Sequence, residues 1–199
     1  QSSGAPSMAA SLQEGHIARL GEVSTIADGI AVKEPGVNTF EMCNRYVDEV
    51  VTVSDDEIAA AILALIEQQK IVAEGAGAVS VAAVMYNKVP VTGKKVVCLV
   101  SGGNIDVSTL SRVITRGLSK SGRNYTFSID LADKPGQLSG VCNVIADAGG
   151  NIISVSHERI NTSAEINGCT IRIELETRDN AHIASIREAL ADKGYKVLN

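Results

Sequence analysis

The sequence predicts an α/β protein in which two different domains follow one another. Residues 96–100 are a continuous apolar run that ends in a Ser-Gly-Gly turn before a helical pattern, which is typical of a buried parallel strand in an α/β domain. From Asn124 onward, the sequence shows strand patterns, in which apolar and polar residues alternate, and helical patterns. Their order is β-α-β-β-α-β, which is typical of a ferredoxin-like domain. We therefore expect one domain over residues 1–118, a linker over 119–123 and a second domain over 124–199.

The composition excludes several classes of function. The chain has 45% hydrophobic and 21% charged residues, as ordinary globular proteins do. A formal net charge of -5 argues against nucleic acid or an anionic membrane as the main partner. No apolar run approaches the roughly 20 residues that a membrane span requires. We expect no nucleic-acid partner and no membrane partner.

The cysteines and histidines show no spacing typical of a metal site. None of the four cysteines belongs to a C-x-x-C pair, and each lies in an apolar stretch. We expect buried free thiols in a reducing cytoplasm, and no metal ligands. The chain also begins at Gln1 without an initiator Met or a signal-peptide pattern, so we expect a fragment of a longer protein.

Helical patterns and short strands alternate through the first domain. Ser54 and Glu57 have the spacing of a capping box at the start of a helix that runs to about Lys70. The other expected elements are a helix at 8–20, a loop closing on a short strand at 22–32, a helix at 39–47 capped by Thr39, a strand at 49–53, a small-residue helix at 73–85 and a helix at 108–118.

Two stretches of the first domain are candidates for a ligand contact. Ser101 places a hydroxyl at the carboxyl end of the expected strand, where open α/β sheets bind ligands, and Gly102 and Gly103 allow close backbone approach. An ordinary strand-to-helix turn explains these residues equally well. Glu74 stands at the start of the small-residue helix, either as a polar contact in a cofactor pocket or as a carboxylate that the helix dipole favours.

The second domain contains one candidate site for a small zwitterion. The loop from Asp133 to Leu138 leads through Gly136 and Gln137 into a helix whose first amides are free to bind an anion. Asp133 could hold an ammonium group, and Asn151 offers both a donor and an acceptor. Such a pocket suits a free amino acid, although the composition of Asp133–Gly136 is equally typical of a simple turn.

Both domains resemble known families. Residues 124–199 resemble an ACT domain, a regulatory module that binds amino acids, on two motifs: Asp133–Leu138 and Ala148–Ile152. Residues 1 to about 118 resemble the C-terminal part of the threonine ammonia-lyase family, pyridoxal-phosphate enzymes of fold type II, the tryptophan-synthase-β type. The motifs that carry this resemblance are Gly4–Met8, Ser24–Val32, Tyr46–Glu49, Val72–Gly77 and Leu99–Asn104.

The resemblance implies a cofactor and its contacts. In that family the serine matching Ser101 bonds the pyridine nitrogen of pyridoxal phosphate, and Gly29 and Glu74 match positions that line the cofactor. The family's Schiff-base lysine, in a Ser-Phe-Lys context, and its glycine-rich phosphate loop are not in this sequence. Some relatives hold a divalent cation at the stretch matching Gln1–Ser7, which has no carboxylates here, so we expect no metal. We expect no catalytic residue in this chain, and no cofactor bound to it alone.

Two functions remain open at this point. The chain could be the C-terminal part of a cytoplasmic threonine ammonia-lyase that converts L-threonine to 2-oxobutanoate and ammonia. A small amino-acid effector would bind at the ACT interface of a homodimer or tetramer, at Asp133, Gly136, Gln137, Leu138 and Asn151. Alternatively, it could be a stand-alone amino-acid-binding or dimerisation module without catalytic activity.

Overall fold

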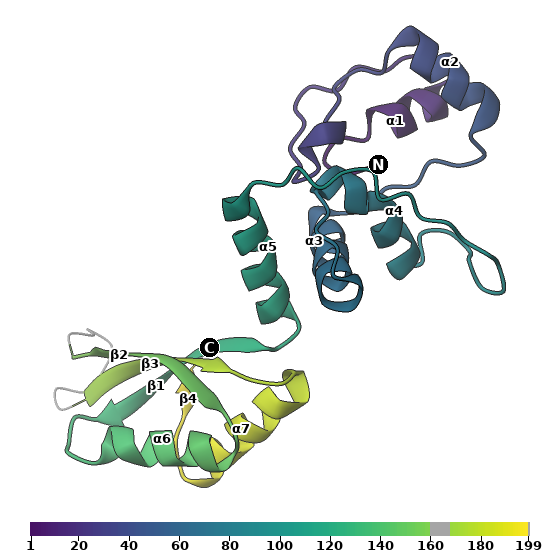
Figure 1. Cartoon of the computed structure of the whole chain (residues 1–199). Helices are drawn as coiled ribbons and strands as arrows, with labels where there is room; N and C mark the ends of the chain where they lie inside the picture. Colours follow the sequence, from purple (N-terminus) through teal and green to yellow (C-terminus); the bar gives the residue numbers. More distant parts are fainter. Residues whose placement is uncertain (160–167, 199) are drawn as a thin grey trace. The chain divides into compact units, whose positions relative to one another are not determined.

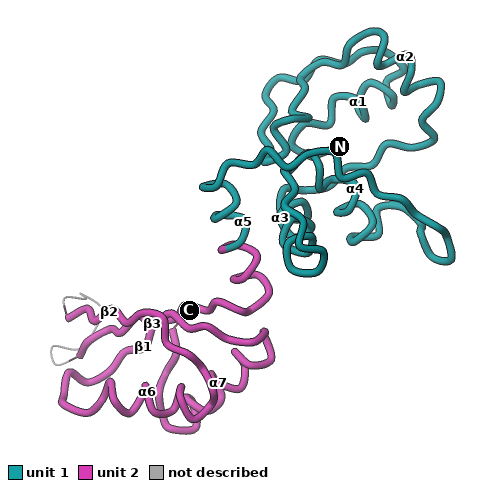
Figure 2. Tube along the Cα trace, in the orientation of Figure 1, with its two compact units in different colours: residues 1–114 teal, residues 115–199 magenta. Residues whose placement is uncertain are grey.

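The computed structural model describes residues 1–159 and 168–198, with the elements labelled in Figure 1. The chain divides into unit 1, Gln1–Ile114, and unit 2, Thr115–Asn199, coloured separately in Figure 2. The division falls within α5. In chain order the elements are α1 (Ser7–Glu14), the 3-10 helix η1 (Asp28–Ile30), α2 (Val37–Tyr46), α3 (Asp55–Ala64), the π-helix η2 (Leu65–Gln69), α4 (Gly75–Met85), α5 (Val107–Lys120), β1 (Asn124–Ala132), α6 (Gln137–Asp147), β2 (Asn151–Glu158), β3 (Gly168–Glu176), α7 (Asn180–Asp192) and β4 (Val197–Leu198).

Helix α3 is the centre of the unit 1 core. Its N-terminus is the capping box that the sequence predicts: the Ser54 amide donates to Glu57 Oε2 at 2.7 Å, and the Glu57 amide donates to Ser54 Oγ at 3.3 Å. Burial alone would raise the pKa of Glu57, but hydrogen bonds from Lys88 and Ser54 lower it below its ordinary value. Ile58 and Ile62 of α3 are fully buried and pack with small residues of α4.

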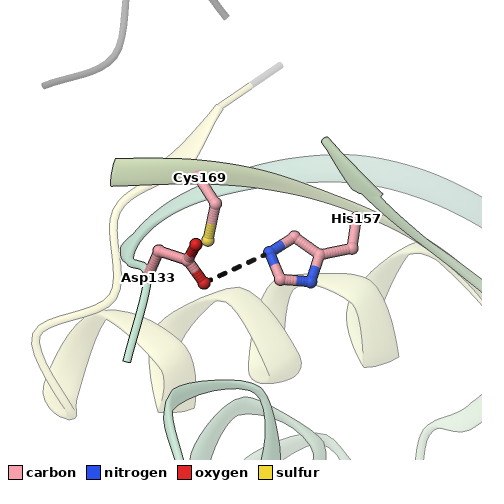
Figure 3. Close-up of side chains that lie close together, drawn as sticks. All are labelled: Asp133, His157 and Cys169. Atoms are coloured by element: carbon pink, nitrogen blue, oxygen red, sulfur yellow. Dashed lines mark ion pairs between the residues drawn. The ribbon is translucent and has the colours of Figure 1, made fainter. Parts of the chain in front are cut away.

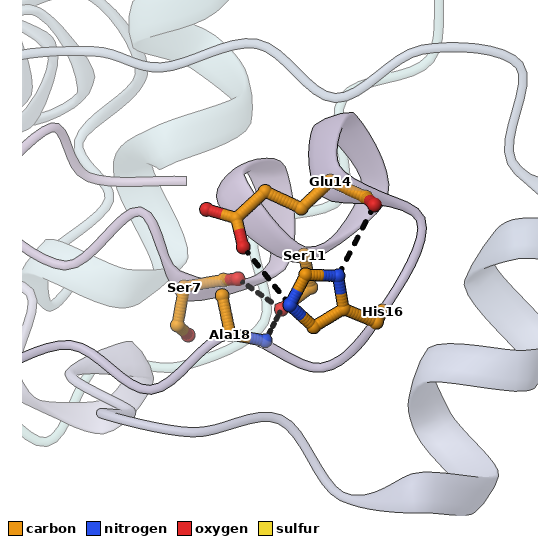
Figure 4. Close-up of polar contacts among 5 residues, drawn as sticks. All are labelled: Ser7, Ser11, Glu14, His16 and Ala18. Carbon is orange, nitrogen blue, oxygen red and sulfur yellow. Dashed lines mark hydrogen bonds and ion pairs between the residues drawn. The ribbon is translucent and has the colours of Figure 1, made fainter.

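The first helix is shorter than its pattern suggests. The helix predicted for residues 8–20 ends before Gly15, whose φ of 73° is left-handed and easily adopted by glycine. Beyond it, the Ala18 amide donates to Ser11 Oγ at 2.9 Å, and that hydroxyl donates to the Ser7 carbonyl at 2.7 Å (Figure 4). A buried serine therefore holds the following loop against α1.

The caps of two other helices differ from expectation. Gly36 is the N-cap of α2, and Thr39 instead donates its hydroxyl back to the Gly36 carbonyl at 2.8 Å. Helix α5 is capped by Asp106, whose Oδ2 accepts from the Thr109 amide at 3.1 Å. Hydrogen bonds from Ser108 and Thr109 lower the pKa of Asp106. Asp106 was therefore the cap signal that the sequence reading overlooked.

The buried parallel strand expected at 96–100 is not formed. The segment is extended but unpaired among the described residues, and Val97 and Leu99 are 95% and 75% exposed. Its attachment to α4 includes a hydrogen bond from Ser80 Oγ to the Leu99 carbonyl at 2.8 Å. A strand needs neighbours for its backbone groups, and the described part of unit 1 offers this segment none.

Parallel pairing in the described part of unit 1 is limited to one bridge, between Ser2 and Val53. The Ser3 amide donates to the Val53 carbonyl at 2.8 Å, and the Val53 amide donates to the Gln1 carbonyl at 2.9 Å. Only the end of the strand predicted at 49–53 is therefore paired. Where a short strand was expected at 22–32, the chain forms η1 and otherwise irregular structure.

Unit 2 has the predicted β-α-β-β-α-β order. Its sheet has the strand order β2-β3-β1-β4 with antiparallel neighbours, and α6 and α7 cover one face (Figure 1). Alternate residues of β1 and β3, such as Ile129 and Ile171, are buried under these helices. The sequence offers Asp179 or Asn180 as the cap of α7, and in the structure it is Asp179, whose Oδ1 accepts from the His182 amide at 2.8 Å. Strand β2 ends at Glu158, and the loop predicted at 161–167 lies outside the described residues.

Candidate functional site

The first turn of α4 is built from small residues because other backbone segments lie directly against it. A Cβ on Gly75 would collide with the Ile26 carbonyl oxygen, and a Cβ on Gly77 would lie 2.7 Å from the Gly102 carbonyl oxygen. Real Cβ atoms do not approach backbone that closely, so both positions require glycine in this packing. The segments at 26–27 and 101–102 are thereby brought to the same end of α4.

Glu74 and Ser101 meet at this helix end. The Glu74 amide donates to the Gly102 carbonyl at 3.0 Å, and the Glu74 carboxylate occupies the space where a Gly102 side chain would lie. Ser101, the preceding residue, is exposed. Its hydroxyl makes no hydrogen bond to the described residues, so it is accessible to a ligand.

Gly29 lies on another side of the same helix turn. Its Cα faces α4 so closely that an added Cβ would lie 3.3 Å from the Ala76 Cβ. Gly29, Ala76 and Leu99 line a largely apolar cavity of about 800 Å³. Glu74 instead lines a second, polar cavity of about 320 Å³, together with Asn104 and other residues. The predicted cofactor residues thus surround one helix end, but Gly29 and Glu74 face different cavities and Ser101 lines neither.

This arrangement fits a flat cofactor in two respects. Gly29 and Ala76, which add little or no side-chain bulk, line the larger cavity and leave space there for a flat ring. The free Ser101 hydroxyl can donate to, or accept from, a ring nitrogen. Pyridoxal phosphate, when bound, supplies an electron-withdrawing ring for chemistry at the amino-acid α-carbon, and Ser101 would hold the ring nitrogen by a neutral hydrogen bond.

In unit 2, the predicted anion site lies at the start of α6. Gly136 precedes the helix with a φ of 91°, a conformation that glycine adopts without strain. The Gln137 amide donates to the Lys134 carbonyl at 3.4 Å, while the Leu138 amide donates to no backbone carbonyl outside its own helix among the described residues. The start of α6 therefore still offers an amide to an anion, as the loop sequence predicts.

Asp133 is not free to receive an ammonium group without competition. Its Oδ2 lies 3.0 Å from Arg159 Nε, and its Oδ1 lies 3.9 Å from His157 Nε2. The Arg159 side chain is 69% exposed, so this ion pair is weakened by solvent and can open. The sequence reading missed both partners, because they come from the far end of β2.

Asn151 is not brought to the Asp133 loop within one chain. Its amide donates to Glu176 Oε2 at 3.1 Å, at one end of β3, whereas Ala132 pairs with Gly168 at the other end. Eight residue steps along β3 separate the two ends by about 26 Å. A site that uses both Asp133 and Asn151 therefore needs a second copy of the domain.

The four cysteines are free, but only one is fully buried. Cys169 lies in the unit 2 core, whereas Cys43, Cys98 and Cys142 are half-buried, which corrects the expectation of uniform burial. Burial, and after it the negative charge of Asp133, raises the pKa of the Cys169 thiol.

Among the described residues, no helix combines the length and the apolar character needed to cross a membrane.

Comparisons with known proteins identify both parts of the chain. Residues 1–102 match the family of pyridoxal-phosphate dependent enzymes, and residues 125–192 match the ACT domain. An L-threonine ammonia-lyase of Thermotoga maritima is 49% identical over 197 residues, which cover 99% of this chain and 49% of that protein. A protein of the same name from Geobacter sulfurreducens is 46% identical over 197 residues, again 99% of this chain and 49% of that protein. The chain spans about half the length of these relatives.

Solved structures agree with the family match. The processed form of threonine deaminase isoform 2 from Solanum lycopersicum is 37% identical with a TM-score of 0.51, covering 57% of this chain and 32% of that one. Maize serine racemase is 30% identical with a TM-score of 0.51, covering 60% of this chain and 38% of that one. The chain belongs to the family of pyridoxal-phosphate dependent enzymes and carries an ACT domain.

Proposed function

We propose that this chain is the C-terminal half of a threonine ammonia-lyase, which converts L-threonine to 2-oxobutanoate and ammonia. The observation that carries the proposal is the joint presence, in one chain, of the Ser101 and α4 arrangement and an ACT domain. Relatives named L-threonine ammonia-lyase match this combination over 99% of the chain. The intact protein, in this proposal, is this chain joined to the further segment that its relatives have and that this chain does not span. The free thiols are consistent with a cytoplasmic location.

The proposal is tested by the activity of the intact protein. Purified protein loaded with pyridoxal phosphate is incubated with L-threonine, and 2-oxobutanoate and ammonia are measured. We expect both products in equal amounts. L-serine serves as the competing substrate, and the ratio of the two kcat/KM values states the preference. Turnover of neither amino acid would leave the alternative, a binding module without catalytic activity, which the two separate hydrophobic cores make structurally feasible.

Within the intact protein, Ser101 holds the cofactor ring. Replacing Ser101 by Ala is expected to weaken retention of pyridoxal phosphate about fivefold, the equivalent of about 1 kcal/mol for one lost hydrogen bond. Cofactor released on dialysis is measured by absorbance. Ser111→Ala, at an exposed position of α5, is the matched control. If Ser101→Ala retains the cofactor and the activity as well as the unsubstituted protein does, Ser101 is only a turn residue and does not contact the cofactor.

The ACT domain is proposed to bind a small amino acid between two copies of the chain. Strand β2 lies at the edge of the sheet and exposes Ile153 and Val155, so a second copy can extend the sheet there. The helix-start amides at Gln137 and Leu138, beside Gly136, would receive the effector carboxylate. Asp133 of one copy and Asn151 of the other would receive its ammonium group. A homodimer, or a tetramer built as a dimer of dimers, satisfies this geometry.

Variants of Asp133 and of its ion-pair partner Arg159 test this site. Asp133→Ala is expected to raise the effector dissociation constant about tenfold, because a charge-assisted contact is lost. Arg159→Gln removes the competing guanidinium and is expected to leave the affinity unchanged or to improve it. Calorimetry of the chain with a panel of branched aliphatic and other small amino acids measures both. Equal binding by Asp133→Ala and the wild type would exclude Asp133 from the site.

A further inference from the structure

Three side chains with different metal-binding chemistry meet at one end of the unit 2 sheet (Figure 3). Asp133 follows β1, His157 is on β2 and Cys169 is on β3. The strand register explains why they meet. Leu131 pairs with Cys169 and His157 pairs with Ile171, so all these side chains point to the helix-covered face. Asp133, two residues beyond Leu131, continues on the same face.

The ligand atoms of these side chains all lie within 4.8 Å of one another. Three ligands around a tetrahedral zinc ion stand about 3.4–3.6 Å apart, given bond lengths of about 2.0–2.3 Å. Rotamer adjustments of the partly exposed Asp133 and His157 side chains can close this difference. Cys169 is 2% exposed and fixed in the core, so it would provide the rigid ligand.

The surrounding charges permit a cation here. Asp133 turns Oδ1 toward His157 and Oδ2 toward Arg159, so a cation bound at Oδ1 does not require the atom that the guanidinium contacts. Arg159 is the positive charge that pairs with Asp133, and its side chain is 69% exposed. It can therefore move toward solvent as a cation enters. Asp130 adds a further negative charge close enough to influence Cys169.

We propose that Asp133, His157 and Cys169 bind one zinc-like divalent cation, with solvent in the fourth position. A thiolate, an imidazole and a carboxylate form a mixed set that suits zinc. Magnesium and calcium prefer six or more oxygen ligands and find only one carboxylate here. Binding exchanges the thiol proton of Cys169 for the metal, and that proton leaves to solvent. No oxidation or reduction is involved.

Titration of the 199-residue chain with zinc chloride, followed by calorimetry, tests the proposal. We expect one zinc per chain and no comparable binding of magnesium chloride. Cobalt(II) chloride is expected to give a thiolate-to-metal charge-transfer band. His157→Gln is expected to weaken zinc binding tenfold or more, since one of three protein ligands is lost. Cys169→Ala is expected to abolish the cobalt band, while Cys142→Ala, a half-buried thiol outside the cluster, keeps it.

His157→Gln decides the question even where Cys169→Ala disturbs the core, because the His157 side chain is exposed and is not part of the core. It also separates this site from the proposed effector site, which shares Asp133 but not His157. We expect this variant to lose zinc and to keep its amino-acid affinity. Unchanged zinc binding by His157→Gln, or a cobalt band that persists in Cys169→Ala, would overturn the proposal. So would the absence of stoichiometric zinc binding by the wild-type chain.

Discussion

The 199-residue chain alone is expected to form no detectable 2-oxobutanoate from L-threonine, whereas the intact protein is expected to form it. Catalysis on this cofactor needs a lysine amine that attaches it covalently. None of the nine lysines follows a Ser-Phe pair, and no glycine run in the sequence is longer than two, so the usual lysine context and phosphate loop are both missing. The expected effect is therefore a complete loss rather than a reduction.

The measurement must show that the inactive chain is folded. Circular dichroism and amino-acid binding by unit 2 serve as positive controls, and pyridoxal phosphate is supplied in excess. The intact protein at equal concentration is the reference. Product formation that scales with the concentration of the 199-residue chain and falls in Ser101→Ala would show that another lysine of this chain can take the catalytic role.

Local rules predicted unit 2 far better than unit 1. In unit 2 each element carries its own signal: alternation places Ile129 and Ile171 inside, and Asp179 caps α7. The sheet closes within the chain, so these local preferences and the global fold agree. In unit 1 the same rules predicted a strand at 96–100, because a continuous run of Val and Leu is typical of a buried strand. Burial of such a strand depends on neighbouring strands, which a local pattern does not report.

The sites show the same division between local and long-range information. Ser101, Glu74 and Gly29 were selected by motif, and all three do lie around the start of α4. That Gly29 and Glu74 face different cavities depends on packing and has no local signal. The meeting of Asp133 with His157 and Cys169 was missed because no two of them are close in sequence. Counting in steps of two along three paired strands would have revealed it, once the strand register was assumed.

A single added methyl group at Gly77 is expected to have a large effect on activity. An alanine Cβ at this position would lie 2.7 Å from the Gly102 carbonyl oxygen and 3.0 Å from the Gly102 amide nitrogen. Both are backbone atoms, so neither can rotate away as a side chain would. Inside a helix, alanine is otherwise favoured over glycine by roughly 0.5–1 kcal/mol. The helix is therefore expected to stay formed and to displace the backbone at 101–102.

Displacement of Gly102 moves Ser101, the adjoining residue, and this is why activity rather than stability reports the change. In the intact protein we expect Gly77→Ala to lower kcat/KM for L-threonine about a hundredfold, the order found when a positioned group moves by about 1 Å. Gly21→Ala, in the same unit but with nothing within 4 Å of the added Cβ, is the matched control and should retain activity. A folded Gly77→Ala protein with normal kcat/KM and normal cofactor retention would mean that the backbone at 101–102 does not position the cofactor.

Because Glu74 also donates its amide to Gly102 at 3.0 Å, the first turn of α4 contacts this backbone at two points. A shift forced at Gly77 is therefore transmitted to the Ser101 hydroxyl instead of being absorbed by a flexible loop.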